Sequence, residues 1–221
     1  MTTHDTGRPG AFERPGRIRG NVDFTLMYVA HDAFLRDLDA LVAAARAGRA
    51  GEPAVRAGWD MFQTQLVVHH RSEDASIWPM LRAEVTLPEH TAVLDAMERE
   101  HSAIDPLLVR IQDALAAPGP RLLDLAVELR DSLAAHLEHE ERQALPLVEQ
   151  YVGARGWAAF AKEIRKEQGV RGGSVFIPWM LHGLPEPTKK RVLATLPPPV
   201  RLGYRLAFRP RFERTPRWIG A

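Results

Sequence analysis

The stretch 69-HHRSEDASIWPML-81 returns 67 residues later as 136-HLEHEERQALPLV-148. In both stretches a His is followed four positions on by a Glu, and the Glu is followed six positions on by a Pro. The match extends upstream, where Phe62 corresponds to Leu129. Residues four apart lie one above the other on a helix face, so each copy predicts a helix whose His and Glu address a common point.

Apolar residues recur at the period of an α-helix in four long segments. Short connections separate the segments, and Gly48 provides a natural stop after the first. Pro79 falls in the last turn of the second segment, and Pro106 predicts a kink in the third. Four amphipathic helices joined by short loops form an up-down-up-down bundle, so we expect an all-α fold. The segments comprise residues 24–48, about 55–81, 91–116 and about 121–152.

The first and third helices repeat each other at an offset of 70 residues, as the second and fourth do at 67. His31 in the first helix therefore corresponds to His101 in the third. We expect two helix hairpins of one plan, each contributing a His from its first helix and a His-x-x-x-Glu pair from its second. The six side chains on the apolar stripes are His31, His69, Glu73, His101, His136 and Glu140.

Six ionisable side chains on apolar helix faces require a common partner. A buried carboxylate or imidazole without a partner costs several kcal/mol, and six of them would overwhelm a marginally stable fold. The chain has no Cys, which excludes disulfides, thiolate catalysis, iron–sulfur clusters and Cys-type zinc sites. Four imidazoles and two carboxylates suit iron or manganese, and zinc is possible on grounds of affinity. The pattern therefore predicts a metal site.

The order His, His-x-x-x-Glu, His, His-x-x-x-Glu over residues 31–140 resembles the hemerythrin-like (HHE cation-binding) family. The similarity covers roughly residues 20–152 and includes the segments 73-EDASIWP-79 and 140-EERQALP-146. It implies a non-haem centre of two iron ions with a bridging oxo or hydroxo group, which reacts with dioxygen, peroxide or nitric oxide. Iron is expected ahead of manganese or zinc. The resemblance makes the four His terminal ligands and the two Glu bridging carboxylates.

One departure from the family concerns the number of His ligands. Oxygen-carrying hemerythrins have five, two of them four apart on one helix, whereas the residues at that spacing from His101 are Met97 and Asp105. Four His leave up to two coordination places open, which favours a peroxidase- or catalase-like enzyme acting on a diatomic or peroxide ligand. The alternative is an oxygen or iron sensing or storage protein without turnover. Candidates for a further ligand are Asp105, Tyr28, Glu100 and His139.

His70 and Asp74 share the spacing of the ligand pair but lie one position off the apolar stripe. We expect them to support the ligands or to face solvent, with His70 able to hold a carboxylate or solvent partner. His139 and Glu141 are expected on a polar edge of their helix. The repeat itself selects the neighbouring His and Glu of the stripe as the ligands.

The two ends of the chain differ in composition from the middle. Residues 1–20 are polar and rich in Gly, Pro and Arg, which predicts a flexible basic arm and not a signal peptide. Residues 21–152 are assigned to the bundle, and residues 153–221 to a basic, Pro- and Arg-rich extension of helical and irregular structure. From Thr188 onward it has nine Lys and Arg against one acid, so it could contact an anionic surface. Its segment 175-VFIPWML-181 is expected to pack over a bundle end or to gate access to the metals.

No apolar run approaches the ~18 residues of a membrane span. The net charge of +1 gives no overall attraction to nucleic acid or membrane. We therefore expect a cytoplasmic protein. No motif identifies an electron donor.

Overall fold

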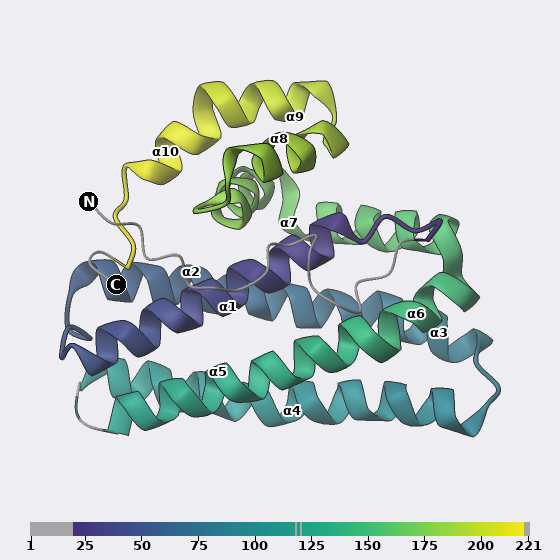
Figure 1. Ribbon diagram of the computed structural model, residues 1–221, viewed down its shortest axis with the longest axis horizontal. Coiled ribbons are helices and arrows are strands. Elements are labelled where there is room, and N and C mark those ends of the chain that lie inside the picture. Colours follow the sequence, from purple (N-terminus) through teal and green to yellow (C-terminus); the bar gives the residue numbers. More distant parts are fainter. Residues whose placement is uncertain (1–19, 118, 120, 219–221) are drawn as a thin grey trace.

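Four antiparallel helices make the body of the molecule (Figure 1). The computed structural model describes residues 20–117, 119 and 121–218, so the predicted N-terminal arm lies outside the described residues apart from Gly20. The first helix is α1 (Thr25–Arg46), and the second comprises α2 (Pro53–Ser72), η1 (Glu73–Ile77) and α3 (Trp78–Glu84). The third is α4 (Pro88–Ala116), and the fourth comprises α5 (Arg121–His139), η2 (Glu140–Ala144), α6 (Leu145–Leu147) and η3 (Val148–Val152).

The contacts between these helices confirm the all-α, up-down-up-down bundle expected from the sequence. Both α1 and α4 pack against α5, and α2 packs against α1. Within the described ranges there is no strand. The four periodic segments of the sequence therefore correspond one to one with the four helices of the bundle.

The second and fourth helices each contain a π-helical turn that begins at the Glu of the repeated motif. The N–H of Trp78 donates to the carbonyl of Glu73, and the N–H of Leu145 donates to the carbonyl of Glu140. A Pro follows each donor, and in a regular α-helix its ring would collide with the carbonyl four residues earlier. The extra residue of a π-helical turn relieves this conflict, and such turns are frequent at functional sites.

The prolines of the bundle do not end its helices. Pro79 was expected in a last turn, yet α3 continues to Glu84, because the π-helical turn absorbs the missing hydrogen bond. The third helix likewise continues through Pro106 to Ala116. The turns that carry the predicted ligands are therefore supported on each side by further helix.

Ionisable residues divide the hydrophobic core into two clusters. Along α1, Met27 belongs to one cluster and Phe34 to the other, with the buried His31 between them. The same division recurs on α2, α4 and α5, where His or Glu separates the two apolar stretches. The polar side chains thus form one layer across the bundle, and apolar side chains seal it from both ends.

The C-terminal extension lies against one side of the bundle (Figure 1). It consists of α7 (Gly153–Leu181), α8 (Glu186–Thr195), α9 (Pro198–Gly203), η4 (Tyr204–Phe208) and α10 (Arg209–Glu213). Helix α7 bends at Gly169, whose φ of 60° is left-handed, and it packs on α1 and α2. The Trp179 ring lies 5.0 Å from that of Phe34, and its Nε1 donates to Asp37 Oδ2 at 2.7 Å. Residues 175–181 therefore cover the side of the bundle and not its end.

Length and hydropathy together decide whether a helix can cross a membrane. Among the described residues, none of the helices combines the length and the apolar character that crossing requires.

Candidate metal centre

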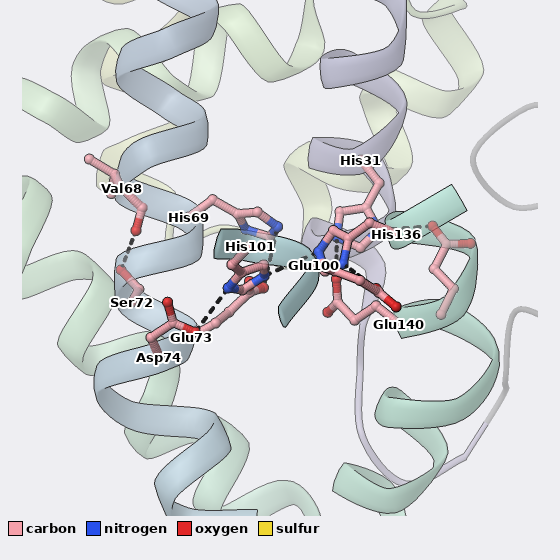
Figure 2. Close-up of polar contacts among 11 residues, drawn as sticks. His31, Val68, His69, Ser72, Glu73, Asp74, Glu100, His101, His136 and Glu140 are labelled. Carbon is pink, nitrogen blue, oxygen red and sulfur yellow. Dashed lines mark hydrogen bonds and ion pairs between the residues drawn. The ribbon is translucent and has the colours of Figure 1, made fainter. Parts of the chain in front are cut away.

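Seven ionisable side chains converge in the middle of the bundle, and their ligand atoms form two groups. The ligand atoms of each group lie within 4.8 Å of one another. Figure 2 shows the imidazoles of His31, His69, His101 and His136 turned toward one another from different helices. The first group is His31, His69, Glu73 and Glu140, and the second is His70, His101 and His136.

In the first group each carboxylate stands beside one imidazole. His31 Nε2 lies 3.3 Å from Glu140 Oε2, and His69 Nε2 lies 3.3 Å from Glu73 Oε1. The other oxygen of Glu73, Oε2, lies 3.6 Å from His101 Nε2, which belongs to the second group. One carboxylate therefore faces both groups, as a carboxylate shared between two cations would.

The second group contains imidazoles alone. His101 Nε2 lies 3.1 Å from His136 Nε2, and the His70 ring stacks on the His101 ring with centroids 4.0 Å apart and planes 12° apart. The sequence pattern places His70 off the stripe, but the side chain is 4 % exposed and a ring nitrogen of His70 joins this group. Three imidazole nitrogens aimed at one point are a common ligand set for transition metals.

Most of the converging atoms have no hydrogen-bond partner among the described residues. The buried atoms without a partner include Nε2 of His31, His69 and His70 and both carboxylate oxygens of Glu73 and of Glu140. Each such atom costs about 1–3 kcal/mol, and more when it is charged. Bound cations would satisfy all of these atoms together, so the residues present fit a metal centre with nitrogen and oxygen ligands.

A carboxylate outside each group holds the opposite nitrogen of a central imidazole. Nδ1 of His31 lies 3.0 Å from Glu141 Oε1, and Nδ1 of His101 lies 2.9 Å from Asp74 Oδ1. When a metal binds, both bonds favour a proton on Nδ1 and so make the Nε2 lone pair available to the metal. Glu141 is 6 % exposed, so its expected place on a polar edge was wrong.

Glu100 supports the second group from the outer side of the bundle. Its Oε2 lies 2.8 Å from His136 Nδ1, and its Oε1 lies 2.8 Å from His139 Nδ1. The His139 side chain is 25 % exposed. Hydrogen bonds to the two imidazoles lower the pKa of Glu100, although partial burial opposes this. A hydrogen-bonded path therefore connects His136 to the surface.

The residues of the centre shift the pKa values of one another in opposite directions. Burial, followed by repulsion from Glu140, raises the pKa of Glu73 well above its usual range. Burial lowers the pKa of His69 and of His70, and the neighbouring imidazoles lower both further. Burial also disfavours the charged form of His31, but the adjacent carboxylates outweigh it and raise its pKa to about 9. Charged and neutral groups are thus held together in a layer that excludes water.

Asp105, one of the further ligand candidates, is exposed on α4 and does not join the groups. Tyr28 is buried, and its ring lies 6.2 Å from that of Phe24. The sequence feature that could have identified His70 as a possible ligand is its position directly after His69. Neighbouring residues on a helix are about 100° apart, too far for one ion but suited to two ions side by side.

Comparison with known proteins bears on this arrangement. No curated protein and no solved structure matches the chain. The family model described as the hemerythrin HHE cation binding domain matches residues 22–148, more than half of the chain and all seven converging residues. The chain belongs to the hemerythrin HHE cation-binding family.

Proposed function

We propose that the centre holds two iron ions and that the protein binds dioxygen, peroxide or nitric oxide there. The observation that supports this most is the set of buried, unpartnered ligand atoms, which fall into two groups sharing Glu73. Iron in such a site supplies an exchangeable coordination position and electrons for a small oxygen- or nitrogen-containing ligand. Imidazole and carboxylate donors without thiolate suit iron, with manganese and zinc as the other candidates.

The numbers of donors favour one exchangeable position over two. His31 and His69 would hold one ion, and His70, His101 and His136 the other. Glu73 faces both groups, and we propose that Glu140 is shared as well, as the family resemblance implies. The first ion would then have one imidazole fewer than the second, so a small ligand would bind on the side of His31 and His69. The expectation of up to two open places rested on four His ligands. A fifth His makes reversible binding of a small ligand the better supported function.

Apolar side chains keep this side of the centre dry. The ring of Phe34 lies 5.2 Å from that of His69, and Leu66 and Ile77 are fully buried on the same helix above and below. Exclusion of water limits side reactions of a bound ligand. The same residues would restrict entry to small molecules.

A peroxidase- or catalase-like activity is the second candidate, and the path from His136 through Glu100 to His139 favours it. Decomposition of peroxide to water and dioxygen requires protons to move between oxygen atoms, and a His–carboxylate–His path to the surface can move them. Oxygen or iron sensing or storage without turnover is the corresponding binding function. Both functions use the same centre and differ in the fate of the bound ligand.

Iron loading without oxygen, followed by metal analysis and optical spectroscopy, tests these functions. We expect about two irons per chain and a spectral change on adding dioxygen that reverses when oxygen is removed, with slow consumption of peroxide. Sustained rapid peroxide turnover would instead establish the enzyme. A chain that binds no iron, or whose spectrum responds to neither dioxygen, peroxide nor nitric oxide, would refute the proposal.

Two variants make the test specific. Glu140→Ala removes a carboxylate of the centre and should abolish the spectral response. His90→Ala should preserve it, because His90 bonds to Tyr151 at 2.9 Å and belongs to neither group.

A further inference from the structure

A cavity of about 170 Å³ lies between α1 and the C-terminal extension. None of its lining residues belongs to either group of the metal centre. Arg36 and Asp37 of α1 form one wall, and the others come from the end of α7, from α10 and from the segment that follows α10. The side chains that line the cavity include those of Trp179, Phe212, Arg217 and Trp218.

Arg217 brings a positive charge to this cavity without an acidic partner among the described residues. Its Nη1 donates to the carbonyls of Phe212 at 2.9 Å and Thr215 at 2.8 Å, and its guanidinium lies 4.1 Å from the centroid of the Phe212 ring. Its Nε is buried and has no hydrogen-bond partner there. Burial lowers the pKa of Arg217, and the nearby charge of Asp37 offsets this only in part.

Trp218 is held at the cavity in a conformation that side chains rarely adopt. Its φ is 56°, the sole positive φ of a residue other than Gly in the described part of the chain. Its N–H donates to the carbonyl of Ala54 at 3.2 Å, and its ring occupies the space that a Cβ on Gly58 would need. Its indole Nε1 is buried and unpartnered among the described residues. Backbone strain of this kind tends to cluster at functional sites.

The acids that line the cavity are engaged elsewhere. Asp37 accepts from Arg36 Nε at 2.9 Å and from its Nη2 at 2.7 Å through Oδ1, and from Trp179 Nε1 through Oδ2. Glu213 Oε1 accepts from Arg209 Nε at 2.7 Å. Both carboxylates are therefore hydrogen-bonded to other Arg side chains, and among the described residues neither forms an ion pair with Arg217, although Asp37 lies near enough to stabilise its charge in part.

We propose that this cavity binds a small carboxylate. Its oxygens accept from Arg217 Nε and Trp218 Nε1, the two buried donors that lack a partner. Its carbon body packs against the rings of Trp179 and Phe212. A guanidinium edge with a neighbouring indole N–H suits a planar anion with two acceptor oxygens.

The size of the cavity limits the ligand. At about 30 Å³ per water molecule, the volume corresponds to five or six waters. Pockets for drug-sized ligands measure roughly 300–1,000 Å³, so this cavity suits a smaller ligand. Inorganic phosphate would leave the aromatic walls without a contact. An anion about the size of benzoate uses both the donors and the walls.

Titration with benzoate, followed by calorimetry and by Trp fluorescence, tests the site in the full chain. We expect one benzoate per chain, bound with equal affinity before and after metal removal, and weaker binding of inorganic phosphate. Benzoate that binds no better than phosphate, that shows no saturable binding, or that binds in the metal-loaded protein alone would overturn the proposal.

Three variants locate the site. Arg217→Gln should weaken benzoate binding by more than tenfold, and Trp218→Phe, which keeps the aromatic bulk and removes one N–H, by about tenfold. Arg211→Gln removes an exposed guanidinium of α10 outside the cavity and should leave the affinity unchanged. If Arg217→Gln unfolds the extension, Trp218→Phe decides alone, and unchanged affinity in Trp218→Phe would refute the proposed donor pair.

Discussion

Replacing His70 by Leu distinguishes two free energies: the stability lost when an unpartnered imidazole is buried without metal, and the stability gained when the imidazole binds a metal. His70 Nε2 is buried and unpartnered, and the side chain is 4 % exposed. Without metal, Leu of similar size removes this unsatisfied atom and should raise the free energy of unfolding by about 1–3 kcal/mol. For a chain of 221 residues this corresponds to a rise in Tm of about 2–4 °C per kcal/mol.

With metal present the same variant should have the opposite effect. The second group falls from three imidazoles to two, and loss of a direct ligand should exceed the roughly 10–100-fold loss typical of residues that only support a ligand. A loss of at least about 100-fold corresponds to about 2.7 kcal/mol of binding free energy. We therefore expect about one metal per chain in place of two, and a smaller rise in Tm on metal addition.

Thermal unfolding with and without chelator, together with metal analysis, measures both effects in one protein. His69→Leu is the matched variant, since it removes one imidazole of the first group and should lose the other ion. His90→Leu, outside both groups, should keep both ions. If His70→Leu binds two metals with unchanged affinity, the assignment of His70 to the second group is wrong.

Three further outcomes are expected from the surroundings of the centre. Glu141→Ala removes the acceptor from His31 Nδ1 and should weaken metal binding by about 10–100-fold in a chelator competition, whereas unchanged affinity would contradict that role. Burial lowers the pKa of three central imidazoles: His69, His70 and His136. Their folded-state values lie below the unfolded value of about 6.5, so their contribution to stability is present above that pH and is lost as pH falls. The Tm of the metal-free protein should therefore decrease from pH 6.5 to 5, because these three outnumber Glu73 and His31, whose raised pKa values act in the opposite sense; a rising Tm would refute this. Trp179→Ala should lower the free energy of unfolding by about 3–5 kcal/mol in chemical denaturation, because the fully buried Trp179 ring joins the extension to α1. A decrease below about 1 kcal/mol would show that the extension is not part of the core.

The sequence predicts those features that depend on helical periodicity and on the internal repeat. The four helices and the convergence of His31, His69 and Glu73 follow from residues that recur on one face. His70 was placed outside the ligand set because one stripe describes one face, whereas two adjacent groups use two neighbouring faces of α2. Periodicity alone does not reveal how many ions a buried layer accommodates.

The burial of Glu141 and the packing of the extension against the side of the bundle were not predicted, for different reasons. Glu141 follows directly on the ligand Glu140 at the start of a π-helical turn, and widening of the helix there changes which residues face inward. The extension lacks long amphipathic periodicity, so nothing in its pattern shows that Trp179 reaches α1. Such contacts between distant segments depend on shape, which spacing in the sequence does not encode.

In each of the two helices that carry a His-x-x-x-Glu pair, the π-helical turn separates two stretches whose side chains follow different directions around the helix axis. Residues before Glu73 and Glu140 are oriented toward the metal layer, and residues after the turns are oriented by packing in the apolar cluster that contains Met27. A π-helical turn holds one residue more than an α-helical turn, so a one-residue deletion within 74–77 would convert it to a regular α-helix and leave the helix on both sides in place. These turns can therefore accommodate the insertion or deletion of one residue without moving the residues that face the metal layer.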